Sequence, residues 1–316
     1  MDKISIIVPC YNEEKVLPLF YQEICKIFAG MPQVQGEFLF IDDGSRDHTL
    51  DILQSLVAQD TRCRFLSFSR NFGKEAAMYA GLQNAQGDYC VIMDADLQHP
   101  PSLLPEMYRV VRDEGYDCCA GFRQDREGEG KMRNFLSRAF YRLMDRICNL
   151  EMRDGAGDFR MMSRTMVQAI LQCQEYNRYM KGLFSFVGFD TKWIPFHNTP
   201  RAAGETKWNL RSLFRYALEG IFSFSTAPIT LVGVIGLVLV AAAFLFGMGL
   251  MVRGLIWAGT VNGLAVVVDV LLLLSGLQFI FLSIVGQYIT KDYMENKNRP
   301  VYIVKRSGGT VKQNHA

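Results

Sequence analysis

The sequence predicts an α/β domain with a mainly parallel sheet, joined to an apolar segment of membrane character. Short apolar runs alternate with helix-like stretches over residues 1–125, which is typical of a parallel sheet with helices. Residues 221–289 contain only two charged side chains, Arg253 and Asp269, although charged residues make up 21% of the 316-residue chain. The mean hydropathy of +0.06 therefore averages a polar domain and an apolar block. This excludes a purely soluble enzyme, a disordered protein and a large multi-pass transporter.

Five strands are expected in the first 125 residues, each short, apolar and bounded by turn residues: 4–8, 37–41, 64–68, 89–93 and 116–120. Helices are expected between them, near 13–28, 48–60, 74–85 and 102–114. Asp47 or His48 is expected to cap the second helix, and Pro100-Pro101 to open the fourth. This alternation favours parallel strands with helices on both faces, and ligands of such sheets bind beyond the carboxyl ends of the strands.

Polar side chains follow the first four expected strands, in the segments PCYNEE, DDGSRD, SRNFGK and DADLQHP. Neither GxGxxG nor GxxxxGK[ST] occurs, so the glycines typical of dinucleotide and P-loop sites are missing. Asp94 and Asp96 instead leave the fourth strand two residues apart. Carboxylates with this spacing can converge on Mg²⁺ or Mn²⁺, which in turn bridges a diphosphate. D-x-D is common in surface turns, and its position at a strand end is what makes it informative.

Charge and cysteine placement narrow the class of protein. The chain up to residue 220 has a slight acidic excess, whereas the tail from Thr290 has six Lys or Arg residues against two acidic ones. This distribution does not fit a basic nucleic-acid-binding protein. All eight cysteines lie between Cys10 and Cys173 without a CxxC pair. We therefore expect reduced thiols in a cytosolic domain.

The apolar block predicts a hairpin of two membrane-spanning helices. Residues 229–252 form a run of 24 apolar or small residues, enough to cross a hydrocarbon core of about 30 Å. A second run covers about 264–287. Basic residues precede the first run and follow the second, so both termini are expected on the cytosolic side of the inner membrane. A buried soluble helix hairpin is the alternative. Asp269 is interpreted as a boundary carboxylate or a helix contact, rather than as a functional group.

Four regions follow from these patterns: a cytoplasmic domain at 1–206, an interfacial amphipathic helix at 207–226, two spans within 227–289, and a basic cytoplasmic tail at 290–316 with a possible strand at 300–306. The interfacial helix is expected because Leu210, Phe214 and Leu218 share one helical face, whereas Arg211 and Arg215 fall on another. The alternative for residues 207–226 is an ordinary helix packed on the domain. The alternative for the possible strand at 300–306 is a disordered tail.

The motifs PCYNEE, IDDGSRDHT, NFGKEAA and DADLQHPP, in this order and spacing, resemble those of inverting glycosyltransferases of family 2, which have the Rossmann-like GT-A fold. With GDFRMMS at 157–163, RAAGETKW at 201–208 and the terminal hairpin, the chain more narrowly resembles polyprenyl-phosphate glycosyltransferases of the dolichol-phosphate mannose synthase and bactoprenol glucosyltransferase types. The resemblance covers about residues 1–306. It implies transfer of a sugar from a UDP- or GDP-sugar to undecaprenyl or dolichyl phosphate, with Mg²⁺ or Mn²⁺ as cofactor.

The resemblance also implies roles for single residues. Those implied to bind the nucleotide-sugar are Pro9, Tyr11, Glu13, Asp42, Asp43, Asp94, Ala95 and Lys207. The implied metal ligands are Asp94, Asp96 and Gln98. Asp158 in GDFR matches the family's catalytic carboxylate, and Asp96 is implied to act in catalysis with it. A simple strand-to-helix turn is the alternative for Asp42 and Asp43, and a solvated linker for Lys207.

A phosphate acceptor changes what catalysis requires. A lipid phosphate is already anionic at pH 7, so alignment and charge stabilisation matter more than a base. Asp158 is therefore expected to accept a residual phosphate proton or to orient the donor sugar, with capping of a helix near Ser163 as the alternative. The residues expected near the acceptor phosphate are Arg123, Arg133, Ser137, Arg138 and Arg201. An exposed basic helix, or a solvated linker at Arg201, is the alternative. Glycines and charges at 124–131 suggest a mobile loop over the site.

Other functions stay open at this point. A processive polysaccharide synthase would need a Q-x-x-R-W motif and more spans, and the sequence shows neither. A glycosyltransferase for a hydroxyl-bearing lipid such as diacylglycerol or a ceramide would need Asp158 as an obligatory base. A non-catalytic nucleotide-sugar-binding membrane scaffold is the third alternative. No motif identifies the sugar, and the resemblance implies a homo-oligomer, with a tetramer suspected.

Overall fold

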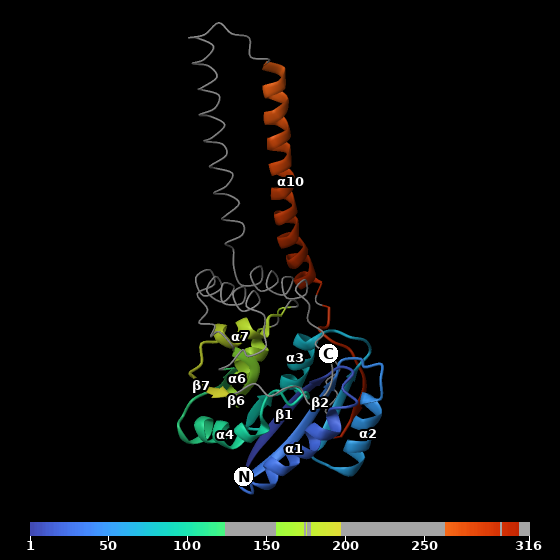
Figure 1. Ribbon diagram of the computed structural model, residues 1–316, viewed down its shortest axis with the longest axis vertical. Coiled ribbons are helices and arrows are strands. Elements are labelled where there is room, and N and C mark those ends of the chain that lie inside the picture. Colours follow the sequence, from blue (N-terminus) through green and yellow to red (C-terminus); the bar gives the residue numbers. More distant parts are fainter. Residues whose placement is uncertain (124–155, 174, 176–177, 197–262, 298, 310–316) are drawn as a thin grey trace. The chain divides into compact units, whose positions relative to one another are not determined.

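The structure is a computed structural model that describes residues 1–123, 156–173, 175, 178–196, 263–297 and 299–309. The chain forms two compact units, one of residues 1–220 with 300–316 and one of residues 221–299. Among the described residues of the first unit is an eight-stranded sheet with the order β7-β5-β6-β4-β1-β2-β3-β8. Figure 1 labels β1, β2, β6 and β7 of this sheet.

The strands are β1 Asp2–Cys10, β2 Val34–Asp42, β3 Cys63–Phe68, β4 Tyr89–Ile92, β5 Cys118–Arg123, β6 Ala156–Ser163, β7 Thr191–Phe196 and β8 Val304–Gly308. The helices of this unit are α1 Leu17–Ala29, α2 Thr49–Gln59, α3 Lys74–Asn84, the 3-10 helix η1 Pro101–Leu103, α4 Leu104–Asp113, α6 Arg164–Gln172 and α7 Met180–Phe186.

The centre of the sheet is parallel, as predicted. β1 pairs in parallel with β2 on one side and with β4 on the other, and β2 pairs in parallel with β3. α3 packs on β1, β2 and α6, whereas α1 contacts β2, α2 and η1 (Figure 1). α3 comes especially close to β1, because a Cβ on Gly81 would lie 2.1 Å from a methyl carbon of Ile7. Since the strand order runs in opposite directions from β1, the carboxyl ends of β1 and β4 form the switch point at which such folds bind ligands.

Several elements differ from the sequence-based expectation, among them β7, where no strand was expected. β6 is antiparallel to β4 and β5 and lies between them, although no strand was expected there. α1 begins at Leu17 rather than near residue 13, because Glu13 to Val16 form a turn in which the Glu13 carbonyl accepts the Val16 and Leu17 N–H groups. β8 begins four residues after the start of the expected 300–306 strand and pairs antiparallel with β3 of the same chain.

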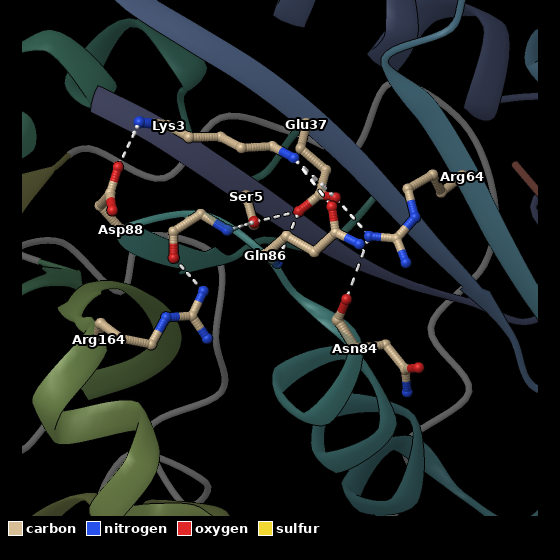
Figure 2. Close-up of polar contacts among 9 residues, drawn as sticks. Lys3, Ser5, Glu37, Arg64, Asn84, Gln86, Asp88 and Arg164 are labelled. Atoms are coloured by element: carbon tan, nitrogen blue, oxygen red, sulfur yellow. Dashed lines mark hydrogen bonds and ion pairs between the residues drawn. The ribbon is translucent and has the colours of Figure 1, made fainter. Parts of the chain in front are cut away.

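A buried polar cluster ties β1, β2 and β3 to the segment after α3 (Figure 2). Glu37 is 2% exposed. Its carboxylate accepts hydrogen bonds from the Ser5 hydroxyl, the Arg64 guanidinium and, at 2.9 Å, the Gln86 backbone N–H. Lys3 adds an ion pair to Glu37 at 3.4 Å. An unpaired carboxylate at this depth would be costly, so the cluster helps to fix how these strands align.

The second unit is described from Gly263 onward, where α10 (Gly263–Asn296) is a helix of 34 residues. Its exposed side chains include Val267, Leu271, Leu282 and Ile289. Within the described part of the chain, no helix combines the length and the apolar character needed to cross a membrane. The expected interfacial helix at 207–226 and first span at 229–252 lie outside the described residues. The transmembrane hairpin therefore stays a prediction.

Candidate active site

The first two strand-to-helix loops are bound to each other at the carboxyl edge of the sheet. The Asn12 N–H donates to the Ser45 hydroxyl at 2.9 Å, and the Arg46 N–H donates to the Asn12 side-chain oxygen at 2.8 Å. Asn12 has a φ of 55°, a left-handed conformation that asparagine adopts more readily than most residues. The PCYNEE loop, with Tyr11 and Glu13 on either side of Asn12, is therefore held in one conformation beside β2.

Asp42 and Asp43, expected to contact the nucleoside, are almost fully buried, at 1% and 4% exposure. Asp42 accepts hydrogen bonds from the Ser45 N–H at 2.9 Å and the Ser67 hydroxyl at 2.6 Å. Asp43 accepts the N–H groups of residues 72 and 73 at 2.6 and 2.9 Å. Burial raises the pKa of Asp43 to about 6 even though these N–H groups act in the opposite direction. Both carboxylates therefore shape the loops after β2 and β3, which agrees with the turn alternative and leaves a role in forming the nucleoside pocket.

Lys74 lies between the two carboxylates for which the sequence predicts chemistry. It is the first residue of α3, and its Nζ is 2.7 Å from Asp94 Oδ1 and 2.8 Å from Asp158 Oδ2. The pairing of β4 with β6 explains the meeting, because Ile92 lies opposite Arg160 and two further residues along each strand lead to Asp94 and Asp158. No role was predicted for Lys74 from the sequence, although its place in NFGKEAA at a strand-to-helix junction was a usable signal.

The charges around Lys74 keep both carboxylates ionised. Burial by itself opposes ionisation of Asp158, but the positive charges of Lys74 and then Lys181 hold the pKa of Asp158 well below its usual range. Burial likewise opposes ionisation of Asp94, and the Lys74 charge, followed by His99, lowers the pKa of Asp94. In return, the two carboxylates raise the pKa of Lys74 despite the opposing effect of burial. In this part of the site, the Lys74 ammonium group therefore lies between the ionised carboxylates of Asp94 and Asp158.

The DADLQ segment after β4 forms a tight turn at the same edge. Asp96 Oδ1 accepts the Gln98 N–H at 3.1 Å, and Leu97 has a left-handed φ of 60°. Arg123, at the end of β5, donates to the Gln98 side-chain oxygen at 3.3 Å. The structure thus places two of the expected metal ligands in one turn and one expected acceptor residue in contact with it. Ala95, between the two aspartates, is buried.

His99 supports this turn from the core, and no role was expected for it from the sequence. Its Nδ1 accepts the Asp94 N–H at 3.3 Å. The ring stacks on Phe159 with centroids 5.1 Å apart and planes 9° from parallel, and Phe196 meets it edge-on at 6.0 Å. Burial lowers the pKa of His99, which favours the neutral ring that can accept this hydrogen bond. A single histidine has no spacing that would have revealed this position.

The donor set suits a hard divalent cation that is also bound by a substrate. Asp94 and Asp96 offer carboxylate oxygens, the ligands that Mg²⁺ and Mn²⁺ prefer. In the described ranges no group of three His, Cys, Asp or Glu side chains is placed to hold a metal ion. Two carboxylates still fit the common arrangement in which one or two protein carboxylates and substrate phosphates share a Mg²⁺ ion. The Gln98 amide is neutral and its oxygen accepts from Arg123, whereas the two aspartates carry negative charge, so the aspartates are the better ligands.

The alternative role of Asp158 as a helix cap is wrong, and several expected site residues lie outside the described part of the chain. Ser163 itself caps α6, since its hydroxyl accepts the Met166 N–H at 3.3 Å. Asp158 is therefore not the cap of that helix and lies within β6. The expected site residues outside the described part of the chain are Arg133, Ser137, Arg138, Arg201 and Lys207, together with the loop at 124–131.

The amino-acid sequence of the chain is similar to those of known proteins. The family described as Glycosyl transferase family 2 matches residues 5–171. A prophage bactoprenol glucosyl transferase homolog of Escherichia coli K12 is 39% identical over 304 residues, which cover 96% of this chain and 99% of that protein. The SfII prophage-derived bactoprenol glucosyl transferase of Shigella flexneri is 38% identical over 305 residues, with 96% and 98% covered. A crystal structure of Mycobacterium tuberculosis glucosyl-3-phosphoglycerate synthase with Mn²⁺, UDP-glucose and phosphoglyceric acid has a TM-score of 0.45 at 21% identity, covering 70% of this chain and 77% of that one.

Proposed function

The chain belongs to glycosyl transferase family 2, and on this basis we propose that it is a membrane-bound inverting glycosyltransferase that moves a sugar from a nucleotide-sugar to a polyprenyl phosphate. The product is a lipid monophosphate sugar. Two relatives named as bactoprenol glucosyl transferases, matched over nearly their whole length, support this acceptor class. The structural observation that carries the proposal is the meeting of Asp94 and Asp158 at Lys74, beside the Asp96 turn.

The donor lies beyond the carboxyl ends of β1 and β4 in this proposal. The nucleoside contacts the loop with Pro9, Tyr11 and Glu13, and its diphosphate faces Asp94 and Asp96. A Mg²⁺ or Mn²⁺ ion held by these two aspartates would offset the charge of the departing diphosphate. A phosphate oxygen of the lipid attacks the anomeric carbon from the opposite face. The bond to that oxygen forms as the bond to the diphosphate breaks, so the anomeric centre inverts.

The charge on Asp158 favours an orienting role over a basic one. A carboxylate whose pKa lies well below its usual range is a weak base, and a general base works best with a pKa near the operating pH. A phosphate acceptor loses its second proton with a pKa of about 6 and is largely ionised at pH 7. A lipid hydroxyl would need a much stronger base. The pairing of Asp158 with Lys74 therefore supports a phosphate acceptor over diacylglycerol or a ceramide.

We further propose that the protein sits at the cytoplasmic membrane, with both termini and the catalytic unit on the cytosolic side. The two apolar runs and their basic flanks support this orientation. The exposed apolar side chains of α10, such as Leu271 and Leu282, support a lipid environment for that helix. A homo-oligomer, with a tetramer as its suspected form, is proposed on the family resemblance alone.

The experiment is a transfer assay with the full-length protein in lipid nanodiscs containing undecaprenyl phosphate. Radiolabelled UDP-glucose, UDP-GlcNAc and GDP-mannose are offered in turn with Mg²⁺ or Mn²⁺. We expect one donor to give a lipid-extractable sugar that chelation abolishes. Asp96→Asn should lower the rate by about 100-fold, because the ion loses a ligand.

Asp113→Asn is the matched control, since it removes the same charge from an exposed position on α4. It should leave the rate unchanged. The proposal is wrong if no donor gives a lipid-linked product, or if Asp96→Asn keeps full activity. Labelling of diacylglycerol in place of undecaprenyl phosphate would establish the alternative acceptor.

A further inference from the structure

We propose that Lys74 is an internal cation that occupies Asp94 while the donor is absent, and that the same ammonium group positions Asp158 for the reaction. This inference rests on the proposed glycosyl transfer and deepens it by one residue. Lys74 would act through Asp158, so it is a positioning residue. It would also set how readily a divalent cation enters the site.

The contact with Asp94 has the form that a metal ion would use. Lys74 Nζ lies 2.7 Å from Asp94 Oδ1 and 2.9 Å from Asp94 Oδ2. One ammonium group therefore contacts both oxygens of a carboxylate that the proposed function assigns to the cation. The Lys74 ammonium group and a divalent metal ion would compete for Asp94, because their positive charges repel each other at short range. Entry of the metal with the diphosphate would displace the ammonium group from Asp94.

The contact with Asp158 is different, because Lys74 reaches only one of the two oxygens of that carboxylate. Asp158 Oδ2 accepts a hydrogen bond from Lys74 at 2.8 Å. Asp158 Oδ1 is buried and has no hydrogen-bond partner among the described residues. A buried oxygen without a partner costs free energy that a substrate hydroxyl would recover. Lys74 thus holds Asp158 by one oxygen and leaves the other directed to a ligand.

The backbone around Lys74 is anchored, while its side chain is accessible. The Gly73 N–H donates to Asp43 at 2.9 Å, and Gly73 has a φ of 99°, in a region where only glycine is at ease. The neighbouring Glu75 carboxylate accepts the Met180 N–H at 2.8 Å. The Lys74 side chain itself is 38% exposed. The ammonium group can therefore change partners by movement of its side chain, while the start of α3 stays fixed.

The test is a Mn²⁺ titration of the full-length protein without donor, followed by electron paramagnetic resonance. Lys74→Met keeps the length of the side chain and removes its charge. We expect Lys74→Met to bind Mn²⁺ roughly tenfold more tightly than the unchanged protein, because a competing positive charge is gone. The same variant should lose about 100-fold in kcat for sugar transfer, because Asp158 is no longer aligned. Adding Asp94→Asn to Lys74→Met should abolish the gain in Mn²⁺ affinity.

Two further variants separate charge from structure. Lys74→Arg keeps the charge, so its Mn²⁺ affinity should stay within about twofold of the unchanged protein while kcat is partly retained. Lys26→Met removes an exposed lysine of α1 that contacts Glu23 and should change neither quantity. If Lys74→Met does not fold, as judged by circular dichroism, Lys74→Gln gives the same comparison.

The test is decisive because Lys74→Met is expected to raise the Mn²⁺ affinity and to lower kcat. A purely structural lysine would lose Mn²⁺ affinity and kcat together, and that result overturns the inference. So does equal Mn²⁺ affinity in Lys74→Met and the unchanged protein, including no binding by either. The titration needs neither donor nor acceptor, so it gives an answer even if no sugar transfer is found. Conversely, an active enzyme with unaltered Mn²⁺ affinity in Lys74→Met would remove this inference and leave the proposed function intact.

Discussion

At the scale of single residues, two buried carboxylates have pKa shifts of opposite sign, although burial acts on both in the same direction. Burial opposes the ionisation of Glu37, but its hydrogen bonds from Ser5 and Gln86 and the Arg64 charge lower its pKa (Figure 2). Burial also opposes the ionisation of Asp43, and there it prevails, so the pKa of Asp43 is raised to about 6. The difference lies in the neighbours, because Glu37 accepts from the Ser5 hydroxyl and the Arg64 guanidinium, whereas the like charge of Asp42 adds to the effect of burial at Asp43.

The raised pKa of Asp43 predicts a stability that falls with pH. Between the ordinary value of 3.8 and about 6, folded Asp43 keeps a proton that the unfolded chain has released. The contribution of Asp43 is therefore complete below pH 3.8 and is lost as pH rises through 6, by about 3 kcal/mol as an upper bound. Asp43→Asn has no such proton. We expect the unchanged protein to exceed Asp43→Asn in unfolding free energy at pH 4, and this advantage to shrink by pH 7.

Urea unfolding at pH 4, 5, 6 and 7 measures this difference. At pH 4 the variant should be less stable by about 1–2 kcal/mol, since an amide cannot accept both N–H groups in the same way. Asp113→Asn, on the exposed surface of α4, should give a nearly constant difference across the same range. An advantage of the unchanged protein over Asp43→Asn that grows with pH would contradict the assignment.

At the scale of elements, the sequence predicts the parallel centre of the sheet well and the site only in part. The strands from β1 to β5 have short apolar runs between turn residues, which is a local signal. The placement of Asp158 is not local, because it depends on β6 entering antiparallel between β4 and β5. The same register brings Asp94 next to Asp158 and so gives Lys74 its two partners. The family resemblance identifies Asp94 and Asp158 from the sequence, but only the pairing of the strands shows that both contact Lys74.

The C-terminal strand predicts a further measurable effect. β8 pairs with the edge strand β3, and Tyr302 stacks on Phe68 with ring centroids 5.0 Å apart. The Tyr302 hydroxyl donates to the Gln83 side-chain oxygen at 2.7 Å. We expect Tyr302→Ala to release β8 and to expose the edge of β3. Hydrogen exchange of peptides from residues 63–68 and 300–309 should become about 30-fold faster, which corresponds to about 2 kcal/mol of lost stacking and burial.

Tyr302→Phe is the control that separates the ring from its hydroxyl. It keeps the stacking on Phe68 and loses the hydrogen bond to Gln83, so its effect should be about 1 kcal/mol or less. Peptides from α4, which contacts β5 and β6, should exchange at unchanged rates in both variants. Unchanged exchange at residues 63–68 in Tyr302→Ala would show that β8 does not depend on this contact.

At the scale of the whole molecule, the chain leaves and re-enters the same compact unit. Residues 1–220 and 300–316 belong to one unit, with β8 in the same sheet as β1, whereas residues 221–299 form the other. The segment between them must therefore begin and end on one side of any membrane that it enters. This requires an even number of crossings, which is the number that the two apolar runs predict. The place of β8 at the edge of the sheet is compatible with the two crossings that the hydropathy predicts, and the crossings themselves stay a prediction.

The even number of crossings predicts how topology reporters behave in bacteria. Alkaline phosphatase, active only outside the cytoplasm, should be active when inserted after Gly259, between the two apolar runs, and inactive when fused after Ala316. Val240→Arg combined with Leu245→Arg should disrupt the first crossing, because two arginines near the centre of a span cost about 5 to 7 kcal/mol. The reporter after Gly259 should then lose its activity. Activity of the reporter after Ala316 in the unchanged protein would contradict an even number of crossings. It would also conflict with the pairing of β8 and β3, since a translocated tail could not reach a cytosolic sheet.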